Sequence, residues 1–133
     1  MTIRAVVFDI GETLTSDTRY WTDWAHWLDV PPHTMSALVG HVLAQGLDNS
    51  EAIRILRPDC DIDAEWRARQ AARQAAGRGE RLDESDLYPD VRPALRQLRD
   101  AGLWVGIVGN QNPAVTGLLR ALDLPADAIA TSG

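Results

Sequence analysis

Short apolar runs alternate with longer amphipathic stretches along this chain. Residues 3–10 (IRAVVFDI) form an apolar, β-branched run that ends at Asp9 and Gly11, and residues 103–108 (LWVGIV) form a second run. Continuous apolar runs of this length predict strands that are buried on both faces, as in a parallel sheet. A third strand is predicted to begin within residues 127–130.

Helical spacing dominates the chain between the first strand and about Leu87. Trp21, Trp24 and Trp27 recur every three positions, which places them on one face of a helix that ends before Pro31. Further helices are predicted over residues 33–45, 49–56, 63–77, 91–100 and 114–122. Because the last two helices alternate with strands, the fold class is α/β with a parallel sheet.

Composition narrows the classes of partner. The 133 residues include 13 basic and 19 acidic side chains, for a formal net charge of −6. This balance disfavours nucleic acid and anionic membranes as partners, and no apolar run reaches the roughly 20 residues that a membrane helix needs. One cysteine and no secretory pattern favour a cytoplasmic protein. All the basic residues are arginine, which excludes lysine chemistry within this chain.

The candidate chemistry follows the first two predicted strands. Asp9 through Thr13 come directly after the first strand, and Gly109 through Asn112 come after the second. Ligands of open parallel sheets bind beyond the carboxyl ends of the strands. A carboxylate there, next to free backbone N–H groups, suits a loop that holds a phosphate while the carboxylate attacks it.

Residues 6–14 (VVFDIGETL) resemble the first motif of the haloacid dehalogenase-like hydrolases, in which apolar residues precede D-x-D-G-T-L. Residues 15–87 are similar to the helical cap that many members insert at this point, and residues 105–110 lie where the second motif is expected. The resemblance implies a Rossmann-like three-layer core, here of about three strands, over residues 1–14 and 88–133. The cap would then comprise residues 15–87.

The resemblance also implies a role for each matched residue. Asp9 would be the catalytic nucleophile and would carry an aspartyl phosphate. The Asp9 carboxylate and the Gly11 carbonyl would bind Mg²⁺, while Thr13, Gly109 and Asn110 would hold the phosphate. The implied activity is that of a Mg²⁺-dependent phosphatase acting on a small phosphorylated metabolite.

Three departures from the family pattern keep other functions open. The second aspartate of the motif falls on Gly11, the Ser or Thr of the second motif falls on Gly109, and the basic and second acidic motifs that would follow lie past the last residue given. The alternatives are a metal-independent 2-haloacid dehalogenase that uses Asp9, or a catalytically inactive, dimerising module or fragment. The strand over residues 3–8 is expected to be an exposed edge that pairs with a second copy or with a missing segment.

Other polar residues allow a structural and a functional interpretation. Asn110 either holds phosphate or starts a turn, and Glu12 is either a solvated loop acid or a substrate contact. The tryptophan face indicates packing inside the cap or a partner surface. Five arginines of the predicted cap form either a solvated helical face or a contact to an anionic substrate. They are Arg67, Arg69, Arg73, Arg78 and Arg81.

Overall fold

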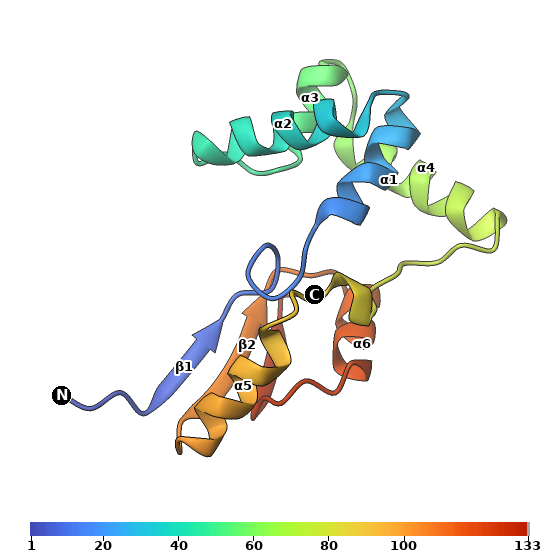
Figure 1. The fold of residues 1–133 in the computed structure, drawn as a ribbon. Helices are drawn as coiled ribbons and strands as arrows, with labels where there is room; N and C mark the ends of the chain where they lie inside the picture. Colours follow the sequence, from blue (N-terminus) through green and yellow to red (C-terminus); the bar gives the residue numbers. More distant parts are fainter. Residues whose placement is uncertain (133) are drawn as a thin grey trace. The chain divides into compact units, whose positions relative to one another are not determined.

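The protein's computed structural model describes residues 1–132 and contains a three-stranded parallel sheet (Figure 1). Its strands are β1 (Ala5–Phe8), β2 (Trp104–Gly109) and β3 (Ala128–Thr131), and they lie in the order β1-β2-β3. The predicted α/β class with a parallel sheet is therefore confirmed.

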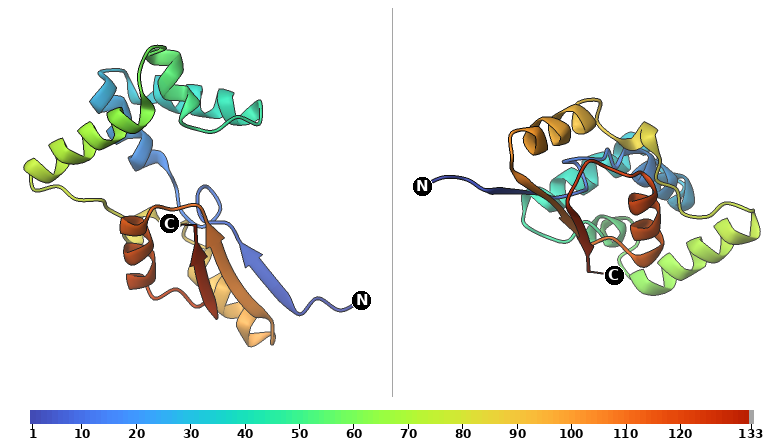
Figure 2. Two further views of the ribbon diagram at one scale, coloured as in Figure 1. Left: turned by 180° about the vertical axis from the view of Figure 1, so that it is seen from behind. Right: turned by 90° about the horizontal axis from the view of Figure 1, so that it is seen from below.

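Strand β1 lies at an edge of this sheet in the described residues, and both views in Figure 2 place it there. Phe8 pairs with Ile107 of β2, and Gly109 of β2 pairs with Thr131 of β3. The parallel register brings the carboxyl ends of β1 and β2 to the same side of the sheet. Pairing of the β1 edge with another strand stays a prediction.

The prediction that the first strand is buried on both faces is wrong. Its residues alternate between exposed and half-buried, and Val7 is 54% exposed. Trp104 and Val108 of β2 share the face of Val7 and are also exposed, whereas Val105 and Ile107 on the opposite face are buried. The reason is that the described helices cover only one face of the sheet.

Two helices supply the apolar layer on that covered face. They are α5 (Val91–Asp100), through Leu95, and α6 (Pro113–Ala121), through Leu119. Leu95 and Leu119 are fully buried in the same hydrophobic core as Ile107. Burial of a leucine side chain contributes about 1.5–3 kcal/mol, so this core holds the helices against the sheet.

Residues 18–79 form a second compact unit that is entirely helical. Its core includes Trp21 and Trp24, which confirms that the tryptophan face packs inside the helices. The sheet unit comprises residues 1–17 and 80–133, within which Thr15 forms an isolated bridge with Leu87. The helices of the second unit are α1 (Thr18–Leu28), α2 (Pro32–Ala44), α3 (Glu51–Leu56) and α4 (Ile62–Ala75).

A short 3₁₀ helix, η1 (Glu84–Asp86), precedes α5 in the sheet unit. Asp83 caps it, because the Asp83 carboxylate accepts a hydrogen bond from Ser85 N at 3.0 Å. Within residues 1–132, none of the helices has the length and apolar character needed to cross a membrane.

Candidate active site

Asp9 and Asn110 lie at the same edge of the sheet, because each directly follows one of two paired parallel strands. Both residues are exposed to solvent. Figure 1 shows the looped segment that follows β1 at this edge. The structure therefore brings together the two loops that the sequence predicts to form the site.

The turn after Asp9 is organised around the carbonyl oxygen of Ile10. This oxygen accepts hydrogen bonds from Leu14 N at 2.9 Å and Thr15 N at 3.1 Å, and a longer one from Thr13 N at 3.3 Å. The buried hydroxyl of Thr15 also donates to it, at 3.3 Å. Thr15 thus stabilises the motif loop with its side chain, a contribution that the sequence analysis missed, whereas Thr13 is exposed.

Glu12 holds this loop in place with both oxygens of its carboxylate. One accepts a hydrogen bond from Asp17 N, and the other accepts one from the Tyr88 hydroxyl at 2.8 Å. Its backbone φ is 55°, in the left-handed region that favours glycine, and the family motif has glycine at this position. Glu12 is therefore an exposed loop acid, as one of the two interpretations predicts, and its carboxylate also holds the loop in place.

Asp17 stands beside the place where the family motif has its second acid. The Oδ2 atom of Asp17 lies 3.1 Å from the position that a Cβ atom would take on Gly11. Burial, followed by the charges of Glu12, Asp9 and Asp86, raises the pKa of the Asp17 carboxyl to about 6. The sequence analysis missed Asp17, because no motif places an acid eight positions after the nucleophile.

A serine or threonine at position 109, as in the family's second motif, would require the neighbouring side chains to move. A Cβ atom built there would lie 2.6 Å from Ile10 Cδ1 and 2.6 Å from Gln111 Oε1. Ile10 is buried in the sheet core, so its side chain occupies the space that a hydroxyl-bearing residue would need. The absence of a hydroxyl-bearing residue at position 109 is thus linked to the packing of Ile10, which belongs to the first motif.

Asn110 and Asn112 have different surroundings in the loop after β2. The Asn112 side chain accepts a hydrogen bond from Val115 N at 3.1 Å and caps α6. Asn110 is exposed at the strand end, next to the residue whose carbonyl accepts a hydrogen bond from Ser132 N at 3.1 Å. The structural role in starting the helix therefore belongs to Asn112, and phosphate binding by Asn110 stays a prediction.

The Mg²⁺ ion implied by the resemblance would use the Asp9 carboxylate and the Gly11 carbonyl. Among residues 1–132 there is no group of three or more His, Cys, Asp or Glu side chains arranged to hold a metal ion. Mg²⁺ requires an octahedral set of oxygen ligands. One or two protein carboxylates with waters can complete such a set, so Asp9 and the Gly11 carbonyl suit a part of it. Mg²⁺ binding therefore stays a prediction, and no step of the reaction is assigned to a metal.

The chain has an acid at the end of a parallel strand and an all-helical unit inserted after it, as the resemblance of its first motif implies. Residues 3–132 match the haloacid dehalogenase-like hydrolase family. The chain belongs to this family, as its first motif predicts.

Solved structures with the same fold include a haloacid dehalogenase-like hydrolase from Bacteroides fragilis, with 22% identity and a TM-score of 0.64 over 98% of this chain and 63% of that one. An L-2-haloacid dehalogenase has 20% identity and a TM-score of 0.56, covering 98% and 64%. Another dehalogenase has 21% identity and a TM-score of 0.56, covering 98% and 63%.

The chain thus spans slightly less than two thirds of the length of these structures. At this level of identity the likeness shows the fold. A search of curated proteins found no match to the sequence.

Proposed function

We propose that this protein is a hydrolase in which the Asp9 carboxylate displaces a halide from the carbon next to a carboxylate group, without a metal ion. The observation that carries the proposal is the set of charges at the site. Gly11 replaces the second acid of the motif, and the charged groups that act on neighbouring Asp17 are all carboxylates: Asp9, Glu12 and Asp86.

This acidic surrounding favours attack on carbon over attack on a phosphate ester. A phosphoryl group carries negative charge on its oxygens, and its transfer depends on cations that neutralise that charge. In the proposed substrate the reacting carbon carries no formal charge, and the neighbouring carboxylate carries one negative charge, where a phosphate monoester carries about two. A halide also leaves without needing a proton. The absence of a proton donor at position 11 therefore lowers the rate of this reaction less than it lowers the rate of phosphate ester hydrolysis.

The reaction would proceed in two steps. An Asp9 oxygen forms a bond to carbon as the carbon–halogen bond breaks, and the halide leaves with the electron pair. Water then adds to the carbonyl carbon of the Asp9 ester and the alcohol leaves, which regenerates the carboxylate and releases one proton. The Asp17 carboxylate is the group proposed to accept that proton, because it lies beside the motif loop and interacts electrostatically with Asp9.

Two of the solved structures with this fold are dehalogenases, which supports the proposal by analogy. A second candidate function is the hydrolysis of a small phosphate ester. The placement of Asp17 favours it, because a carboxyl with a pKa of about 6 can donate a proton to an alkoxide leaving group. In that case a cation from outside the described residues would have to offset the acidic charge.

The test compares two substrates on the 133-residue chain. Purified protein is incubated with each enantiomer of 2-chloropropionate and with p-nitrophenyl phosphate, in EDTA and in Mg²⁺. The proposal expects chloride release that EDTA does not affect, and a loss of at least about 10³-fold in Asp9→Asn. A single turnover in water enriched in oxygen-18 should label the peptide that contains Asp9.

Asp90→Asn is the matched control, because Asp90 is exposed and its side chain makes no capping hydrogen bond. It should retain the parent's rate. Phosphate release that requires Mg²⁺ would overturn the dehalogenase proposal in favour of the second candidate. Absence of turnover with both substrates would overturn both and support the non-catalytic module.

A further inference from the structure

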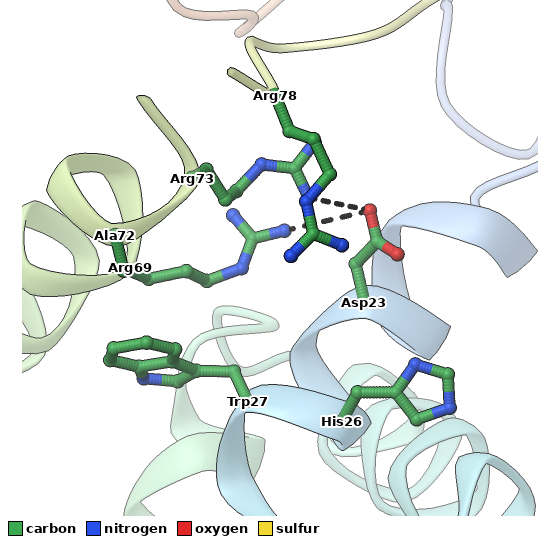
Figure 3. Close-up of a pocket in the computed structure, with 7 residues that line it drawn as sticks. All are labelled: Asp23, His26, Trp27, Arg69, Ala72, Arg73 and Arg78. Atoms are coloured by element: carbon green, nitrogen blue, oxygen red, sulfur yellow. Dashed lines mark hydrogen bonds and ion pairs between the residues drawn. The ribbon is translucent and has the colours of Figure 1, made fainter. Parts of the chain in front are cut away.

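The helical unit contains a cavity of about 240 Å³, and three of the seven residues that line it are arginines (Figure 3). Helix α1 contributes Asp23, His26 and Trp27, while α4 and the segment after it contribute the rest of the lining: Arg69, Ala72, Arg73 and Arg78. These residues carry three guanidinium groups and one carboxylate. The formal net charge of the lining is therefore +2 with His26 neutral.

Asp23 fixes the orientation of two of the arginines. Its Oδ2 atom accepts a hydrogen bond from Arg73 Nη1 at 2.7 Å and lies 4.0 Å from Arg69 Nη2. Arg73 Nη2 donates to the Gly79 carbonyl at 2.8 Å, which ties the end of α4 to the segment after it. A guanidinium group held at several points loses little entropy when it binds an anion.

Arg69 is buried beneath aromatic rings. Its side chain is 2% exposed, and its Cζ atom lies 4.8 Å from the ring centroid of Trp24 and 5.6 Å from that of Tyr20. The interpretation of this arginine as part of a solvated face is therefore wrong. The cation contributes positive potential from within the unit, where water screens charge weakly.

Two donor groups of the lining have no acceptor in the described part of the chain. The Nε atom of Arg73 is buried and has no hydrogen-bond partner there. The Arg78 guanidinium forms no ion pair or hydrogen bond with any residue from 1 to 132. In Figure 3 it reaches toward the Asp23 carboxylate, beside the other two guanidinium groups.

We propose that this cavity binds a dianionic oxyanion of a small organic molecule, either a phosphate group or a pair of carboxylates, with the exposed Arg78 as the hydrogen-bond donor and Arg69 and Arg73 as fixed positive charges beside it. Guanidinium groups bind both anions through parallel N–H donors. The half-buried Trp27 ring lines the same cavity, and its Nε1 is engaged by Glu65 at 2.7 Å. The apolar face of this ring is thus held in place beside the organic part of the ligand. The proposal does not depend on the reaction proposed for Asp9.

The test measures binding of inorganic phosphate and of malonate to the 133-residue chain by isothermal titration calorimetry at low ionic strength. We expect saturable binding of one equivalent of at least one anion. Arg78→Gln should weaken it about tenfold, the effect of losing one charge-assisted contact. Because Arg78 is exposed and its side chain makes no hydrogen bond or ion pair with residues 1–132, this variant should fold like the parent.

Arg67→Gln is the matched control, because Arg67 is an exposed arginine of α4 that does not line the cavity. It changes the net charge equally and should alter the dissociation constant by less than about twofold. Preference for phosphate or for malonate identifies the chemistry of the ligand. Equal weakening by the two substitutions, or dissociation constants above about 10 mM for both anions, would overturn the proposal.

Discussion

Asp17 and Gly11 are complementary: the carboxylate of one lies 3.1 Å from where the other would carry its first side-chain atom. A residue larger than glycine at position 11 would crowd this carboxyl group. Asp17, at the start of the segment that leads into the helical unit, therefore lies beside the position at which the family motif has its second acid. Substitutions at either residue test this close approach.

Restoring the acid of the family motif should destabilise this protein. Gly11→Asp places a second carboxylate beside Asp17, and we expect the free energy of unfolding to fall by about 1 kcal/mol at neutral pH. Adding Asp17→Asn should recover most of the loss. Urea denaturation measures both effects, and Gly79→Asp is the control, because nothing lies within 4 Å of a Cβ atom at that position. Equal losses in Gly11→Asp and Gly79→Asp would contradict the prediction.

The stability of the sheet unit should fall as the Asp17 carboxyl ionises. Burial, with the charges of Glu12, Asp9 and Asp86, raises its folded-state pKa to about 6, so the folded protein binds this proton more tightly than the unfolded chain does. The stabilisation is complete below about pH 4 and is lost as pH rises through 6.

Asp17→Asn should therefore be more stable than the parent at about pH 7.5, by about 1 kcal/mol after allowance for solvent screening. The difference should disappear near about pH 4. Denaturation at the two pH values measures this, with Asp90→Asn as the control that stays close to the parent at both. A constant difference between parent and Asp17→Asn at the two pH values would show that the titration of Asp17 is not its cause.

Restoring the hydroxyl of the second motif should also lower the free energy of unfolding. Gly109→Ser forces a Cβ atom to within 2.6 Å of Ile10 Cδ1, and overpacking of this kind costs about 1–3 kcal/mol. Ile10→Val removes that methyl group, so the double variant should lose less stability than the two single losses predict. Gly117→Ser is the control, since a Cβ atom there meets nothing within 4 Å. Strictly additive losses would show that Ile10 and Gly109 are not coupled.

Asp23 should be the most sensitive ionic position of the helical unit. Asp23→Ala removes the carboxylate that pairs with Arg73 at 2.7 Å and leaves the 2%-exposed Arg69 with less compensating charge. We expect a loss of about 2–3 kcal/mol, because a buried charge that loses its partner is costly. Thermal or urea unfolding measures this, and the exposed Asp59→Ala should stay within about 0.5 kcal/mol of the parent.

Much of the fold could be predicted from local patterns. Apolar runs and helical spacing depend on neighbouring residues, so the helix over residues 91–100 is predicted at its observed bounds and each strand is found within a residue or two. The position of Asp9 at the end of the first strand was predictable for the same reason, because Asp9 lies at the end of the first apolar run. The exposure of Val7 could not be predicted from a local pattern, because it depends on which elements cover the sheet.

The contacts that complete the candidate site join residues far apart in the chain. Tyr88 donates to Glu12 across 76 positions, and no local pattern encodes that hydrogen bond. The burial of Arg69 was missed for a different reason. Its charge suggested a solvated position, whereas its spacing of three from Trp66, which packs against the helical core, was the signal that it shares an inward face.

The insertion of the helical unit between β1 and α5 has a consequence for how this chain can vary. The ladder that pairs Val6 with Val105 is closed entirely within the sheet unit. Residues 18–79 can therefore gain or lose a helical turn, and the arginine-lined cavity can change shape, with no shift in the alignment of Asp9 against the loop of Asn110. Variation in the helices is in this way separated from the alignment of the two loops at the strand ends.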